Sequence, residues 1–372
     1  MKQAPRTARD KQATLLRKPR ILFISDTPNW AIARNVDVIE NRLKYKYDIT
    51  KSYFLEKEFA RDIGDYVHIE DCDVKSYDLI IIRSLLFLHQ PHYDRLLNSV
   101  DSSRIVGMAG SHHIFDRPEF IKTFNERRDV FDYFFAVSPG VYTRAVKAFP
   151  DKIVYNTPQG IAVDKFYSDG SHDVSDTVVI GWAGNADHGS PVDHKRFYKI
   201  IVPLVEWVVQ NGGTINGRKY RFEFAARKIQ NHVKYLLQQT GIVNIREVDY
   251  ADMRKWYNGI DIYLNASRSE GIASTSIEAV SCGCALITTD VGLARDVVID
   301  DINGRIVLPI LEEFKSGIMD FADRDKQILH TASNFISHNV LSWDNRIAYT
   351  DVAIQDILLK VRLNHENLYR WH

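Results

Sequence analysis

Short apolar runs recur along the chain and alternate with stretches that have helical spacing. Runs of this kind, near-continuously apolar and bounded by turn residues, are typical of buried strands in a parallel sheet. The strands expected in the first half of the chain are Arg20–Ser25, Tyr77–Arg83, Arg104–Ala109 and Tyr133–Ser138. Those expected in the second half are Val178–Gly184, Tyr220–Ala225, Val243–Val248, Ile260–Leu264 and Ala285–Thr289.

Strands that alternate with helical segments predict an α/β protein with doubly wound parallel sheets. A polar, turn-rich linker at Ser168–Asp173 separates the two groups of strands. We therefore expect a first domain over residues 20–170, a second over 171–345, and a final helical segment over 346–372. In such sheets ligands bind beyond the carboxyl ends of the strands.

One strand of the second group leads into a stretch that is rich in candidate chemistry. After Ile260–Leu264 comes a polar loop, and Thr275-Ser276-Ile277-Glu278 then has the spacing of a capping box, which predicts a helix that starts at Thr275. Gly283 ends this helix, and Ala285–Thr289 is the next strand. Two carboxylates, Glu270 and Glu278, flank the expected helix start.

This layout suits a sugar nucleotide. The backbone N–H groups of Gly271, Ile272, Ala273, Ser274 and Thr275 would lie at a helix N-terminus, which favours an anion such as a phosphate. One carboxylate could accept hydrogen bonds from a ribose diol, and the other from the hydroxyls of a second sugar. The alternative is that Glu278 only completes the capping box and that Glu270 is a solvated loop charge.

The stretch resembles the donor-binding core of the retaining glycosyltransferase family 4, which carries E-x7-E, an "EA…CG" continuation and a strand that leads to a "vG" turn. The corresponding residues are Glu270 to Glu278, Glu278-Ala279, Cys282-Gly283 and Val291-Gly292. Downstream, Asp301–Val307 resembles the family's "dg.nG.lv" segment. The similarity is dense over about fifty residues and looser over the C-terminal half.

The resemblance implies the GT-B architecture, in which two Rossmann-like domains face a cleft and a C-terminal helix crosses back to the first domain. It also implies transfer of a sugar from a nucleotide-sugar to a hydroxyl acceptor with retention of anomeric configuration. A UDP-sugar is the expected donor, although no residue selects UDP over GDP or ADP. The expected acceptor is a glycan, a polysaccharide or a lipid-linked sugar, on the side of the first domain.

Further site residues are carried over from the family position by position. The glycine turn of the second domain's first strand is Gly181–Gly184, and Asn185 stands where the family has arginine. Lys195 best matches the family's lysine, which would offset the charge of the leaving pyrophosphate, and Arg196 competes for that role. His112 or His113, after the strand Arg104–Ala109, is expected to contact the donor sugar. The family's Gly-Gly acceptor loop is replaced by Asn29-Trp30-Ala31.

Composition narrows the class of protein. Lys plus Arg and Asp plus Glu both number 48, so no global field favours nucleic acid or a membrane. No apolar run has transmembrane length, and the three cysteines have no metal-site spacing and no plausible disulfide framework, which favours a cytoplasmic protein. Residues 1–19 are basic and are expected to form a disordered tail, or a weak peripheral contact with an anionic membrane face.

We expect no metal ion and no other cofactor. Asp71-Cys72-Asp73 spells the D-x-D of metal-dependent transferases, but it lies outside the donor-binding half. The glycine pattern of a nicotinamide site is also absent from the sequence. The competing hypothesis is a non-catalytic sugar-nucleotide-binding or assembly protein of the same fold, which the missing Gly-Gly pair and arginine keep open.

Overall fold

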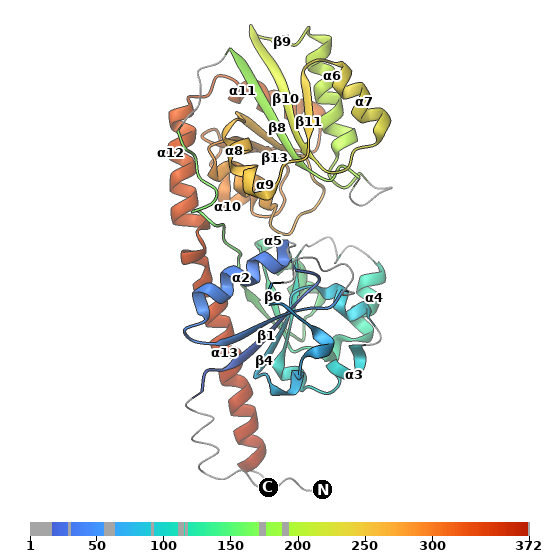
Figure 1. Ribbon diagram of the computed structural model, residues 1–372, viewed down its shortest axis with the longest axis vertical. Coiled ribbons are helices and arrows are strands. Elements are labelled where there is room, and N and C mark those ends of the chain that lie inside the picture. Colours follow the sequence, from blue (N-terminus) through green and yellow to red (C-terminus); the bar gives the residue numbers. More distant parts are fainter. Residues whose placement is uncertain are drawn as a thin grey trace.

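Two parallel β-sheets, each packed with helices, form the frame of the protein (Figure 1). The computed structural model describes residues 17–28, 31–55, 64–90, 93–110, 115, 118–170, 176–187 and 193–370. The two sheets belong to two domains that lie one beyond the other along the longest axis of the molecule. A single long helix, α13 (Trp343–Arg370), runs beside the first domain (Figure 1).

The first sheet has the order β3-β2-β1-β4-β5-β6-β7, and all of its described pairings are parallel. Its central strand β4 consists of Leu79–Ile82 and is fully buried, as expected for a run of large aliphatic residues between two layers of helices. The remaining strands are β1 (Arg20–Ser25), β2 (Asp48–Tyr53), β3 (Val67–His68), β5 (Ile105–Ala109), β6 (Tyr133–Ala136) and β7 (Ile153–Asn156). The helices are α2 (Ala31–Leu43), α3 (Asp94–Leu97), α4 (Pro118–Glu126) and α5 (Pro139–Ala148).

The second sheet has the order β11-β10-β8-β12-β13-β14, with a short antiparallel strand β9 beside β10. Its strands are β8 (Thr177–Gly184), β9 (Thr214–Ile215), β10 (Arg218–Ala226), β11 (Val243–Arg246), β12 (Ile262–Asn265), β13 (Ala285–Thr288) and β14 (Gly304–Ile306). Its helices are α6 (Val202–Gln210), α7 (Asn231–Gln239), α8 (Met253–Asn258), α9 (Ser274–Ser281), α10 (Ala294–Val297), α11 (Leu311–Phe321) and α12 (Lys326–Ile336). Two hydrophobic clusters fill the two sides of this sheet.

The C-terminal helix α13 returns to the first domain. Ile354, Ile357 and Val361 recur at helical spacing and are buried in the core cluster of the first domain. Polar contacts strengthen this packing, since Asp351 accepts a hydrogen bond of 2.7 Å from the Tyr47 hydroxyl and forms an ion pair with Lys46. The predicted return of the last helix to the first domain is therefore confirmed.

The chain crosses between the domains twice, and the two crossings touch. The Ile161 N–H donates to the Leu341 carbonyl at 2.8 Å. A Cβ atom on Gly160 would lie 2.7 Å from the Cα atom of Trp343, so only glycine allows this approach. The predicted linker at 168–173 begins as packed chain, because the Ser168 hydroxyl is buried 2.8 Å from Nδ1 of His330. Residues 171–175 lie outside the described part.

Two parts of the chain bear on the expected membrane contact. Of the basic N-terminal segment the structure describes only residues 17–19, where Arg17 forms a bidentate contact with Asp78 at 2.7 and 2.8 Å. Residues 1–16 lie outside the described part. None of the described helices is long and apolar enough to cross a bilayer.

Candidate active site

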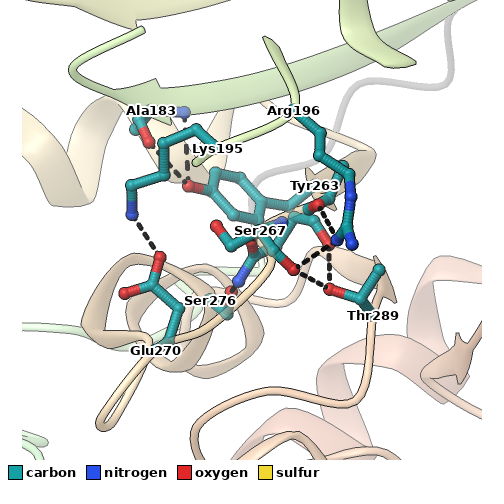
Figure 2. A network of polar contacts seen from close by, with 10 residues as sticks. Ala183, Lys195, Arg196, Tyr263, Ser267, Glu270, Ser276 and Thr289 are labelled. Atoms are coloured by element: carbon teal, nitrogen blue, oxygen red, sulfur yellow. Dashed lines mark hydrogen bonds and ion pairs between the residues drawn. The ribbon is translucent and has the colours of Figure 1, made fainter. Parts of the chain in front are cut away.

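The candidate site is built on the loop that follows strand β12. Its anchor is the buried Asn265, whose Oδ1 accepts from the Ser267 N–H at 3.1 Å and whose Nδ2 donates to the Ser276 hydroxyl at 2.9 Å. Just after strand β13 (Ala285–Thr288), the Thr289 hydroxyl donates to the Ser267 carbonyl at 2.7 Å (Figure 2). These buried contacts fix both ends of the loop, so the loop enters helix α9 along a defined path.

Helix α9 begins one residue earlier than predicted, and the capping box does not form. Its N-cap is Ala273, which has a left-handed backbone (φ +60°), and no side chain caps the helix. Thr275 is therefore inside the first turn and cannot serve as the cap. Two of the four described non-glycine residues with positive φ, Ala273 and Arg196, lie in this site, where strained backbone often accompanies function.

Glu278 is consequently not a capping residue. It lies one turn inside α9, where its Oε2 accepts a hydrogen bond of 3.0 Å from the hydroxyl of the buried Tyr257. Burial raises the pKa of the Glu278 carboxyl to about 7, although Tyr257 and the more distant Arg34 both act in the opposite direction. A carboxylate that accepts one hydrogen bond from the described side chains and has an elevated pKa is suited to accept further hydrogen bonds from a ligand.

Glu270 and Lys195 form an ion pair across the site (Figure 2). Their side chains remain 18% and 20% exposed, so both groups are shielded but still accessible to a ligand. Burial raises the pKa of the Glu270 carboxyl, but the Lys195 ammonium, with smaller help from Ser267 and His194, outweighs it, and the net pKa lies below its usual value. Glu270 is therefore ionised at neutral pH.

The segment 193–196 places Lys195 opposite Glu270. Asp193 accepts backbone hydrogen bonds of 2.9 Å from Phe197 and from Lys199, which closes the start of the following helical turn. Arg196 adopts a left-handed backbone and donates from one guanidinium nitrogen to the carbonyls of Ala266 and Ser267, both at 3.0 Å (Figure 2). Arg196 thus supports the loop, whereas Lys195 points to the carboxylate.

The end of strand β8 lies beside the same loop. The Tyr263 hydroxyl is 3.2 Å from the Ala183 N–H, which joins β8 to β12 (Figure 2). Gly184 has φ +152°, and the side chain of Asn185 accepts from the Asp187 N–H at 3.1 Å. Asn185 therefore stabilises its own turn in this structure, and no contact of its side chain with Glu270 or Lys195 is found among the described residues.

Some of the predicted site residues lie outside the described part of the chain. His112 and His113 fall outside the described residues, and so do Asn29 and Trp30 of the expected acceptor loop. The D-x-D sequence lies in the first domain, where Asp71 ends a short 3-10 helix. Within the described residues no group of three His, Cys, Asp or Glu side chains is arranged to hold a metal ion.

Sequence reasoning missed three residues around Glu278. Tyr257 is fully buried and donates to the Glu278 carboxylate, while Tyr250 is partly exposed and interacts electrostatically with Glu278. Arg34, on α2 of the first domain, lies with its guanidinium carbon 4.2 Å from the centre of the Tyr250 ring and acts electrostatically on Glu278. An aromatic pair spaced by seven residues before a strand is common in cores, so no local pattern distinguished these residues.

The part of the chain that carries this site is similar to known proteins. Residues 179–324 match the family model described as "Glycosyl transferases group 1", and this match includes most of the second domain and all of the loop and helix described above. A stretch of 66 residues is 41% identical to the UDP-N-acetylglucosamine–peptide N-acetylglucosaminyltransferase GtfA subunit of Streptococcus gordonii. That match covers 18% of this chain and only 13% of the relative.

Similarity in three dimensions extends over nearly the whole chain. A glycosyltransferase from Rickettsia africae superposes with a TM-score of 0.68 at 16% identity, covering 92% of this chain and 99% of that one. The Anabaena protein HepE in complex with UDP and glucose gives a TM-score of 0.65 at 14% identity, with coverages of 91% and 100%. The fold is GT-B, as the sequence predicted.

Proposed function

We propose that this protein is a glycosyltransferase that moves a sugar from a nucleotide-sugar donor to a hydroxyl acceptor. The single observation that carries the proposal is the arrangement of two partly accessible carboxylates on either side of the α9 N-terminus, with the Lys195 ammonium facing the first of them. The family match over residues 179–324 supports it, because that region contains every one of these groups.

Each group has a role in donor binding. Glu278 accepts hydrogen bonds from the ribose hydroxyls, and Glu270 orients the transferred sugar. The backbone N–H groups of residues 271–275 at the start of α9 bind the distal phosphate. Lys195 offsets the negative charge that develops on the leaving diphosphate, while Gly184 and Asn185 border the donor and Arg196 supports the loop.

UDP is the proposed carrier, because HepE, a structural relative of this chain, was crystallised with UDP and glucose. A second function, non-catalytic binding of a sugar nucleotide, rests on Asn185, whose side chain is engaged in its own turn where the resembling family has an arginine. Incubation with UDP-glucose, UDP-galactose and UDP-N-acetylglucosamine tests both. Release of UDP above the uncatalysed rate, with water taking the sugar, shows that the protein cleaves the donor and supports a catalytic function. Binding of the nucleotide-sugar with no release of UDP supports the second function.

We further propose that the reaction retains the anomeric configuration. Glu270 is held by Lys195 and assigned to the sugar hydroxyls, so it is not placed as a covalent nucleophile in this proposal. A front-face displacement, in which the leaving diphosphate itself assists the incoming hydroxyl, is then the mechanism for retention. The acceptor is a glycan, a polysaccharide or a lipid-linked sugar that approaches from the first domain.

Turnover is expected to continue in excess EDTA. The charge on the departing diphosphate needs a counter-charge, which metal-dependent transferases supply with an ion held by acidic residues. In this proposal Lys195 and the α9 N-terminus supply it. UDP release should be measured with EDTA alone and with EDTA followed by manganese. Activity that disappears with EDTA and returns with manganese would contradict the proposed leaving-group site.

Nucleotide affinity is expected to fall as the pH drops below about 7. The ribose hydroxyls donate to an ionised Glu278, so below the pKa of the free carboxyl binding must displace a proton. Each pH unit below that value then weakens binding by up to about tenfold. Above pH 7 the affinity should be constant.

The variant Glu278→Gln isolates this effect. Loss of the charged acceptor should weaken UDP binding by about 1.5–3 kcal/mol at pH 8. The terminal phosphate of UDP also titrates, near pH 6 by analogy with phosphorylated side chains, so the wild type and variant should be compared by calorimetry at each pH. The difference between them should shrink toward acid pH. An affinity for UDP at pH 8 that is the same in both proteins would exclude Glu278 as the ribose acceptor.

A further inference from the structure

The first sheet has its own group of buried polar residues at the carboxyl ends of β1 and β4. Ser25 ends β1 and Asp26 and Thr27 follow it, while Arg83 and Ser84 follow β4. Each of these five residues is at most 5% exposed. The strand order β3-β2-β1-β4-β5 reverses direction between β1 and β4. Ligands of doubly wound sheets bind at this kind of reversal.

Arg83 is the unusual member of this group. Its side chain is among the largest fully buried ones in the described structure, and it makes no hydrogen bond or ion pair with any described residue. Nε is shielded from solvent and has no partner. A buried guanidinium without a partner is rare, because removing the charge from water is costly unless hydrogen bonds replace the lost hydration.

The neighbouring hydroxyl groups also lack partners. Ile24 is in register with Ile82, so Ser25 and Arg83 form the next pair and point to the same face of the sheet. The hydroxyl oxygens of Ser25 and Thr27 are buried and have no hydrogen-bond partner among the described residues. Three unsatisfied groups from two adjacent strand ends therefore lie at one edge of the first sheet.

The acidic residues nearby do not neutralise Arg83. Asp26 interacts with it only through space, and its Oδ1 accepts the Thr27 N–H at 2.9 Å. Burial raises the pKa of the Asp26 carboxyl, and the Thr27 N–H and Arg83 only partly oppose this, so Asp26 is a weak counter-charge. Among the described residues of this region, Asp37, Glu40 and Asp65 are all paired with Lys51.

We propose that Arg83, with the hydroxyls of Ser25 and Thr27, forms a binding site for an oxyanion, a phosphate or carboxylate, carried by a sugar substrate. The guanidinium offers planar, paired donors that match such an anion, and the two hydroxyls complete its hydrogen bonds. Asp26, beside them, can accept from a sugar hydroxyl. The site belongs to the first domain and is separate from the carboxylates of the second domain.

Together with the proposed function, this site defines the acceptor class. If the second domain binds the nucleotide-sugar, the substrate at Arg83 is the acceptor, which is then an acidic sugar or a sugar phosphate rather than a neutral one. This identification rests on the proposed function, whereas the oxyanion site itself does not.

The test is a set of calorimetric titrations with glucose 6-phosphate, glucuronate and neutral glucose, each with and without UDP. We expect at least one charged sugar to bind about tenfold or more tightly than glucose. Arg83→Met should remove this preference and leave UDP affinity unchanged. Arg20→Met is the matched control, because Arg20 lies at the opposite end of β1 and is partly exposed; it should bind all sugars as the wild type does.

Two further variants keep the proposal testable if Arg83→Met does not fold. If Arg83→Met shows no cooperative unfolding, Thr27→Val removes one hydroxyl at nearly constant shape and should weaken the charged sugar several-fold. Arg83→Lys keeps the charge but not the paired donors, and it should bind the charged sugar more weakly than wild type does. Glucuronate and glucose 6-phosphate distinguish a carboxylate from a phosphate site.

Two results would overturn the proposal. Equal binding of charged and neutral sugars by the wild type would show that Arg83 is a structural cation. A charge preference that persists in Arg83→Met, or in Thr27→Val and Arg83→Lys together, would move the site elsewhere. If UDP binds neither to the wild type nor to the variants, this result counts against the proposed function alone. The oxyanion site is still tested, because the sugar titrations are also carried out without UDP.

Discussion

Replacing Lys195 by alanine is expected to lower turnover about 100-fold or more, the scale of losing one preorganised electrostatic contact to a developing charge. In the proposed mechanism the Lys195 ammonium stabilises the leaving diphosphate more than the bound donor, because the charge grows as the bond breaks. The effect should therefore appear in kcat, with a smaller change in the affinity for UDP.

The ion pair with Glu270 complicates the reading of this variant. Lys195→Ala leaves the Glu270 carboxylate shielded and without its partner, which should destabilise the protein by about 1–3 kcal/mol. The double variant Lys195→Ala, Glu270→Gln removes the unpaired charge and should recover much of that stability. It should not recover turnover, because neither catalytic group is restored.

The ion pair of Lys326 with Asp261 provides a matched control. It lies at the other end of the sheet, since Asp261 precedes β12 whereas Glu270 follows it, and its lysine is likewise partly shielded. Lys326→Ala should cost some stability and leave turnover unchanged. Urea melts and UDP release on all four proteins give both readouts. Turnover of Lys195→Ala at the wild-type level would assign the leaving-group role to another cation and Lys195 to structure alone.

The fold was predictable because most strands coincide with short apolar runs in the sequence. Leu79–Ile82 and Ala285–Thr288 are buried from end to end, and such runs identify themselves without any tertiary information. Strand β2 (Asp48–Tyr53) was missed for the converse reason. It contains the charged Lys51, which is buried only because three acidic side chains from other segments surround it.

The capping box shows the limit of a local pattern at the site. Thr275-x-x-Glu278 has the correct spacing, yet the helix starts at Ser274 and Glu278 binds Tyr257. What decides the outcome is the left-handed Ala273, whose neighbour Ile272 is held by a turn further along the chain. Arg34 could not be found either, because it reaches the site from the other domain.

The turn that holds Ile272 contains Gly292, and the second prediction with a large expected effect concerns this glycine. Replacing Gly292 by alanine should disrupt the loop that enters α9. Gly292 has φ +61°, and a Cβ atom there would lie 2.4 Å from the Ile272 carbonyl oxygen and 2.8 Å from the Ala273 nitrogen. Both are backbone atoms, so no side chain can rotate away. The same turn donates the Leu293 N–H to the Ile272 carbonyl at 3.2 Å.

The added methyl group must push the loop or the turn out of place. Strain of the left-handed backbone contributes about 1–2 kcal/mol and the overpacking about 1–3 kcal/mol, so the variant should lose roughly 2–5 kcal/mol of stability. Because residues 271–275 are the proposed phosphate site, affinity for UDP should fall at least about tenfold, the value of one displaced charge-assisted contact.

The variant Gly241→Ala separates the backbone strain from the overpacking. Gly241 also has a left-handed backbone, with φ +73°, but a Cβ atom there would meet nothing within 4 Å. This variant should lose only the backbone strain, and its affinity for UDP should equal that of the wild type. If Gly292→Ala and Gly241→Ala lose the same stability in urea and bind UDP equally well, the contact between the 291–293 turn and Ile272 does not hold the loop that enters α9. A larger loss confined to Gly292→Ala, in both stability and affinity, means that the loop geometry depends on this single close approach of two backbones.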